Sequence, residues 1–180
     1  MTAQSLVPRL ITHPTEILNQ LQSGQLLRVK ACSGNAIIIC HRHHAELAGP
    51  GAAVGSSFDI DCSRVIPVGN ISIVYPESRT ERQEAYRRRQ QWILFSQHAM
   101  KSCVPLQRAN NLLILLDKYF DPQTIDPLSD EVLAQLVGVL PKTIGMARQS
   151  IKFQRSRRAQ DLQALNFLGK LQQRVEGRSG

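Results

Sequence analysis

The chain has 180 residues, 42% of them apolar, which permits a packed core and excludes a protein that is disordered throughout. No run reaches the roughly 18 apolar residues of a membrane-spanning helix, and the first residues lack the order of a secretion signal, so we expect a cytoplasmic protein with no membrane partner. The formal charge of +8 favours an acidic partner such as nucleic acid.

Residues 1–77 have the pattern of a small β-rich module. A short helix is predicted over residues 14–22, followed by strand-like apolar runs that are separated by turn residues: 26–31, 35–41, 56–63 and 71–76. The glycine-rich stretch from Gly49 to Ser57 lacks the lysine of a P-loop, so we expect a flexible loop there and not a phosphate site. Whether the module binds an effector or a protein partner stays open.

The segment CHRHH, from Cys40 to His44, contains residue types that bind zinc. On a strand, His41 and His43 would converge on one face while Cys40 and His44 point to the other. No second paired ligand motif lies nearby, and the four cysteines show no CxxC spacing, so we expect a turn cluster, reduced thiols, no metal and no cofactor. No catalytic motif such as GxSxG or HExxH is present, and we expect no enzyme activity.

Residues 78–103 predict one long helix that connects the two parts of the chain. Trp92, Phe95 and Ala99 lie near helical spacing in its second half. Two interpretations of this apolar face stay open: a seam between two copies of the chain, or burial within one copy. For Arg87 to Arg89, the alternatives are contact with DNA or a solvated helix surface.

Residues 130–149, DEVLAQLVGVLPKTIGMARQ, have the spacing of a helix-turn-helix. Where the two helices cross, the first must carry a small residue, and the corner between them needs a residue that adopts positive φ. Ala134 and Gly138 meet these two demands. Ile144 and Ala147, three residues apart, give the second helix a face that packs on the first. An ordinary helical hairpin is the alternative.

Two segments, RANNLLILLDKYF from Arg108 and PLSDEVLAQLVGVLPKTIGMARQSI to Ile151, together resemble the DNA-binding domain of bacterial Crp/Fnr-type transcription regulators. In that family an Arg-led apolar helix precedes a short strand and the helix-turn-helix, and a long helix before the domain forms the dimer seam. The resemblance implies that the second helix enters the major groove, with these residues facing the groove: Pro141, Lys142, Thr143, Met146 and Gln149. The chain departs from the family there, because only Lys142 is charged.

Basic residues gather in and after the second helix. Residues 142–180 hold nine Lys or Arg against two acids, whereas residues 1–78 hold five of each. We expect phosphate contacts from Arg148, Lys152, Arg155, Arg157 and Arg158. Beyond Ile151 no turn is present for the family's winged hairpin, and a terminal helix is predicted from apolar residues at helical spacing: Leu162, Leu165, Leu168 and Leu171.

These patterns predict an α+β fold in three parts: a β-rich module over residues 1–77, a connecting and dimerisation helix over 78–103, and a helix-turn-helix domain with a basic terminal helix over 104–180. The expected function is that of a transcription regulator that binds double-stranded DNA as a homodimer. The alternative is a protein-interaction adaptor that keeps the helix-turn-helix without base readout. RNA binding is disfavoured, because aromatic residues make up only 5% of the chain.

Overall fold

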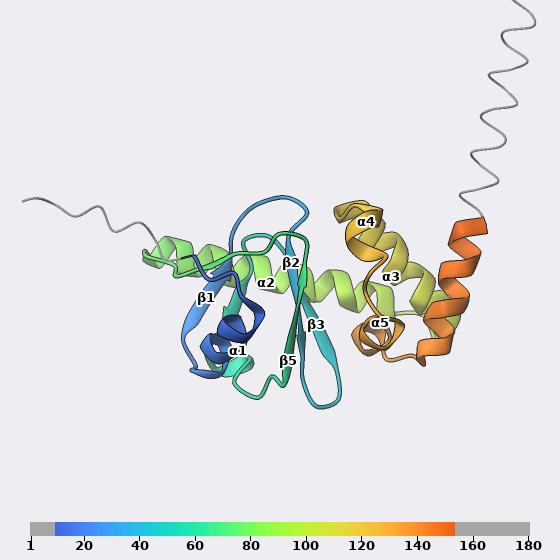
Figure 1. Ribbon diagram of the computed structural model, residues 1–180, viewed down its shortest axis with the longest axis horizontal. Coiled ribbons are helices and arrows are strands. Elements are labelled where there is room, and N and C mark those ends of the chain that lie inside the picture. The colour runs from blue at the N-terminus through green and yellow to red at the C-terminus, as the bar shows by residue number, and fades with distance from the viewer. Residues whose placement is uncertain (1–9, 154–180) are drawn as a thin grey trace, which may run out of the picture.

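The computed structural model describes residues 10–153, and within them the chain has the predicted α+β fold (Figure 1). The elements are α1 (Pro14–Gln22), β1 (Leu26–Val29), β2 (Ala36–Cys40), β3 (Ala45–Ala48), β4 (Ala53–Gly55), η1 (Ser56–Phe58), β5 (Arg64–Val68), β6 (Ile73–Val74), α2 (Arg79–Met100), α3 (Pro105–Tyr119), α4 (Pro122–Ile125) and α5 (Asp130–Val137). Residues 141–153 form a further helix. Within residues 10–153, no helix combines the length and apolar character that crossing a membrane requires.

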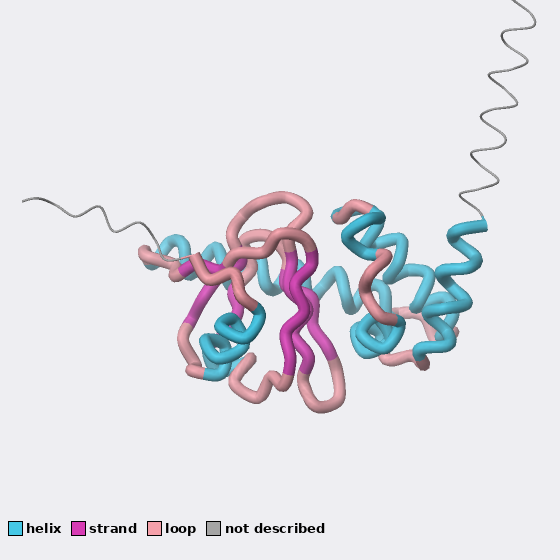
Figure 2. Tube along the Cα trace, viewed as in Figure 1, coloured by secondary structure: helices cyan, strands magenta, loops and turns pink. Residues whose placement is uncertain are grey.

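The described strands form two three-stranded antiparallel sheets, one in the order β4-β1-β6 and the other in the order β3-β2-β5. Figure 2 shows them as two groups of strands joined by loops. The central strand β2 is buried along its whole length and pairs with β3 at one edge and with β5 at the other. Helix α1, at the predicted position, packs against β4 and β5 and buries Ile17 and Leu21 completely.

The strand prediction was only partly right. Three of the predicted runs contain β1, β2 and β6, but residues 56–63 form η1 and a turn instead of a strand. Strands β3, β4 and β5 were missed. β3 and β4 are short and rich in alanine or glycine, which have weak strand propensity, and β5 contains Pro67. This proline is tolerated because β5 is an edge strand of its sheet.

Trp92 on α2 joins the strands to the helical part of the molecule. A Cβ atom at Gly49 would lie 2.0 Å from Cζ2 of Trp92, so only glycine fits beneath the indole. The indole also lies near Tyr119 and Phe120 at the end of α3, with ring centroids 5.2 and 6.1 Å away. Trp92 is buried within one copy of the chain, which rules it out as a seam residue. The stretch predicted as a flexible loop after Gly49 instead contains β4 and η1.

Arg89 ties α2 to the β-rich module, and its position differs from both sequence-based alternatives. Its side chain is 6% exposed and donates hydrogen bonds to the Ala53 carbonyl and to the carboxylates of Asp59 and Glu46. Burial raises the pKa of the Asp59 carboxyl above its ordinary value, although Arg89 and the Gly55 N–H favour the ionised form. Of the three consecutive arginines Arg87 to Arg89 on α2, Arg89 is therefore buried and fixes the helix to the β-rich module.

The segment between α3 and α5 is also different from what the resemblance implies. The expected short strand is absent from residues 120–129, where one helical turn, α4, begins at Pro122. Proline suits the first turn of a helix, because its fixed φ matches the helix and its missing N–H would have no partner there. Ile125 from α4 and Leu128 then join the core of the helical part.

Candidate nucleic-acid interface

Helix α5 has the two ends that a helix-turn-helix requires. At its start, the Ser129 side chain accepts a hydrogen bond from the Val132 N–H. The pKa of Glu131 in this first turn is lowered, because the Glu131 carboxylate accepts hydrogen bonds from the backbone N–H of Glu131 itself and from the Ser129 side chain. At its end, Gly138 has φ +61° and its N–H donates to the Ala134 carbonyl. This left-handed conformation suits glycine and turns the chain toward the next helix.

The second helix, over residues 141–153, packs on α5 as the spacing predicts. Ile144 and Ala147 are both 0% exposed, and they share one core cluster with Ala134. Arg108 has a role in this corner that the sequence patterns did not predict. Its Nη1 donates to the Val137 and Gly138 carbonyls over 3.4 Å, where a positive charge also suits the negative end of α5.

The opposite side of the second helix faces solvent and carries most of the predicted groove residues. Pro141, Lys142, Gln149 and Lys152 are exposed, Met146 is 51% exposed and Thr143 is half-buried. Residues 142, 146 and 149 follow helical spacing of three and four, so they share one face. These side chains are thus free of the core and positioned to contact a partner.

Arg148 has intramolecular partners where the sequence led us to expect a phosphate contact. Its side chain is 16% exposed, with Nε 2.9 Å from Asp130 Oδ1, and its Nη2 donates to the Leu128 carbonyl at 2.5 Å. A further ion pair reaches Asp126 at 3.9 Å. The guanidinium therefore holds the second helix against the start of α5 and does not belong to the exposed face of that helix.

The remaining predicted phosphate-binding residues, Arg155, Arg157 and Arg158, lie outside the described residues, as does the predicted terminal helix. Within residues 10–153, apolar side chains also reach the surface around the second helix. Leu140 is 72% exposed and Phe153 is 65% exposed, in addition to Met146. The candidate interface therefore combines few charges with apolar surface.

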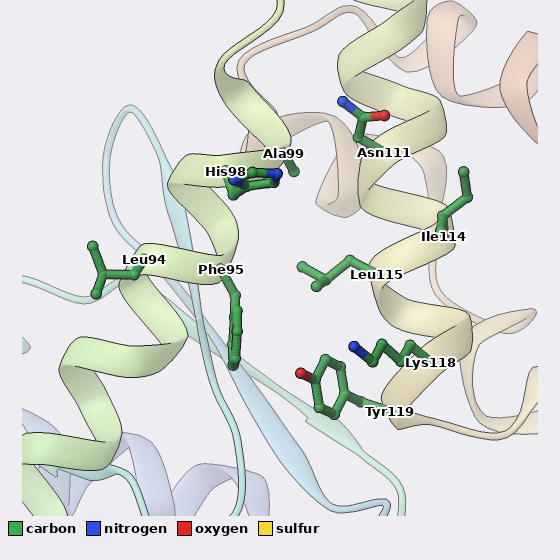
Figure 3. Close-up of a pocket in the computed structure, with 9 residues that line it drawn as sticks. All are labelled: Leu94, Phe95, His98, Ala99, Asn111, Ile114, Leu115, Lys118 and Tyr119. Atoms are coloured by element: carbon green, nitrogen blue, oxygen red, sulfur yellow. The ribbon is translucent and has the colours of Figure 1, made fainter.

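A separate surface lies between α2 and α3, where an open groove encloses about 610 Å³. Figure 3 shows Phe95, Leu115 and Tyr119 pointing into the space between the two helices. At its edges, Leu94 and Ile114 are 62% and 61% exposed. Large apolar side chains exposed in such a cluster are typical of surfaces that bind another protein.

No family model matches the chain, and no curated protein matches it.

Proposed function

We propose that the protein is a cytoplasmic transcription regulator that binds double-stranded DNA through its helix-turn-helix. The observation that carries this proposal is the division of the helix over residues 141–153 into two faces. Ile144 and Ala147 are fully buried, whereas Lys142, Met146 and Gln149 are exposed. A helix supported in this way can enter the major groove without disturbing its own core.

The exposed side chains can make a small number of contacts that depend on the DNA sequence. The Gln149 amide can make paired hydrogen bonds with adenine, and the apolar Met146 can contact a thymine methyl group. Lys142 and Lys152 provide positive charge for phosphates. Because the face has few groups that form paired hydrogen bonds with bases, we propose binding that is semi-specific and depends strongly on salt.

A Lys142→Glu variant tests this proposal directly. The change replaces a positive charge with a negative one beside the phosphates, so we expect duplex DNA to bind at least about tenfold more weakly, with a shallower dependence on salt. Fluorescence anisotropy titrations at several salt concentrations measure both quantities. The matched control is Lys30→Glu, which makes the same charge change at an exposed position next to β1. If Lys142→Glu binds like the parent at every salt concentration, this helix does not bind DNA.

A second candidate function is supported by the apolar side chains around the same helix. Leu140, Met146 and Phe153 are all more than half exposed, which is unusual for a surface that binds only phosphates and base edges. A protein-interaction adaptor would use them against an apolar partner. DNA-binding titrations of the parent protein distinguish the two functions. A regulator binds duplex DNA at submicromolar concentration with a steep salt dependence, and an adaptor does not.

We also propose that the regulator is a homodimer. One reading helix makes few contacts, and two copies bound to neighbouring half-sites make twice as many. The groove between α2 and α3 offers the apolar surface for this pairing, through Leu94, Phe95 and Ile114. The seam proposed here differs from the one suggested by sequence spacing, since Trp92 and Ala99 are buried within one copy.

Light scattering during gel filtration is expected to give a dimer mass at micromolar concentration. Ile114→Asp places a charge at the edge of the groove and should shift the protein toward monomer. Ile60→Asp is the matched control, because Ile60 is also half exposed but lies in the turn before β5. A parent protein that stays monomeric with and without DNA contradicts the dimer. A dimer that Ile114→Asp leaves intact contradicts this seam.

A further inference from the structure

The turn between β2 and β3 brings two histidines together that a strand would separate. Cys40 pairs with Ala45 across the hairpin, and the His41 N–H donates to the His44 carbonyl at 2.9 Å. The rings of His41 and His44 stack with centroids 4.7 Å apart and planes 10° apart. Residues 41–44 form the turn that the sequence led us to expect, so their side chains do not alternate between two faces as they would on a strand.

A carboxylate, that of Glu46, is the third member of this cluster. Glu46 on β3 places Oε1 3.5 Å from Nε2 of His44, and one ligand atom from each of His41, His44 and Glu46 lies within 4.8 Å of the others. Two ligand atoms on a tetrahedral zinc ion are about 3.4 Å apart, given metal–ligand distances of about 2.0–2.2 Å. His44 and Glu46 already have this separation.

His41 has the environment of a metal-binding histidine. Its side chain is only 4% exposed, and Nδ1 lies 2.9 Å from Oδ1 of Asp61. A carboxylate at Nδ1 favours the tautomer that leaves a lone pair on Nε2, the same arrangement that orients zinc-binding histidines. Among the described residues, this buried Nε2 has no hydrogen-bond partner, and Oδ1 of Asp59 is 3.7 Å away. A cation at Nε2 would remove the cost of an unpaired buried acceptor.

The surrounding charges favour a cation as well. Three carboxylates, of Glu46, Asp59 and Asp61, surround the histidines, and Arg89 is the guanidinium paired with two of them. Arg89 holds Oε2 of Glu46 at 2.5 Å, which leaves Oε1 directed toward His44.

We propose that the β2–β3 turn binds one Zn²⁺ ion through His41, His44 and Glu46. This nitrogen and oxygen ligand set suits zinc, and three protein ligands leave a fourth position for water. The His44 side chain is 57% exposed, so it can rotate out of the stack and direct its lone pair at the ion. The proposal rests on this geometry alone and not on DNA binding, and it replaces the sequence-based expectation that the chain holds no metal.

The location of the site places the ion beside the helix-turn-helix. His44 and Glu46 also line a cavity of about 260 Å³, whose other walls include Gln135 and Leu136 of α5 and the corner residue Gly138. Side chains of α2 also line this cavity. The metal ligands therefore lie on the hairpin that faces the first helix of the helix-turn-helix.

Calorimetric titration of the full chain with ZnCl₂, after treatment with a chelator, tests the site. We expect one Zn²⁺ per chain. Removing an outer partner of a metal ligand commonly weakens binding about 10–100-fold, so loss of a ligand itself, in His44→Ala or Glu46→Gln, should weaken it by at least about 100-fold. Asp61→Asn alters the outer partner of His41 and should weaken Zn²⁺ binding by about 10–100-fold. His43→Ala is the matched control and should bind like the parent, since His43 is exposed and lies outside the cluster.

Titration with Co²⁺ shows which atoms hold the metal. The exposed thiols of Cys32 and Cys103 are the competing ligands, and thiolates give cobalt a charge-transfer band that histidine and carboxylate ligands do not. We expect a tetrahedral cobalt spectrum without that band. The proposal is overturned if Zn²⁺ does not bind stoichiometrically, if His44→Ala and Glu46→Gln bind as tightly as the parent, or if the cobalt spectrum shows thiolate ligands.

Discussion

Replacing Arg89 with methionine is expected to lower the free energy of unfolding by about 3–5 kcal/mol, which is typical of removing one partner from a buried ion pair. Arg89 donates to both oxygens of Asp59, whose side chain is 0% exposed. Without the guanidinium, Asp59 keeps, among the described residues, the hydrogen bond from the Gly55 N–H and the distant Nε2 of His41 at 3.7 Å, and Glu46 loses its partner at Oε2. Methionine preserves much of the packing volume, so the measured loss reports mainly the charges.

Chemical denaturation followed by circular dichroism measures this loss. Arg88→Met is the matched control, because Arg88 pairs with Glu84 on the exposed side of the same helix and should matter little. The double variant Arg89→Met with Asp59→Asn should be more stable than Arg89→Met alone, since it leaves no unpaired carboxylate at position 59. An Arg89→Met protein as stable as the parent would show that this buried network does not anchor α2.

Ile144→Asp is expected to unfold the helix-turn-helix, with a loss of more than about 3 kcal/mol. Ile144 is 0% exposed and belongs to the core that the second helix shares with α5. A carboxylate there would be surrounded by apolar side chains, with no described basic group in that core cluster to pair with it. We expect a weaker helical signal in circular dichroism, a lower melting temperature and loss of DNA binding together.

Met146→Asp serves as the matched control for this prediction. It places the same charge two residues further along the helix, where the side chain is 51% exposed. We expect Met146→Asp to fold like the parent while binding DNA more weakly, because only the exposed face has changed. If Ile144→Asp melted like the parent, the second helix would not be packed on α5 as the structure places it.

Local patterns in the sequence were sufficient to predict α1, α2 and the two helices of the helix-turn-helix. Helix α2 extends over nearly all of the predicted residues 78–103, and α1 has the predicted bounds. The corner of the helix-turn-helix was also predictable, because a small residue, a glycine and two apolar residues meet demands that act within a few turns of the chain. The burial of Ile144 and Ala147 and the positive φ of Gly138 confirm that part of the prediction.

Interactions between distant residues decided what local patterns did not reveal. Strand β4 forms because it pairs with β1, and Arg89 is buried because Asp59 and Glu46, far away in the sequence, meet it on α2. Arg148 similarly forms its ion pair with Asp130 only because the two helices cross. His41 and His44 became candidate metal ligands only because the folded chain places them beside Asp61 and Glu46. In each case the energy comes from pairing or charge neutralisation between groups that local sequence spacing does not bring together, so only the tertiary structure could determine it.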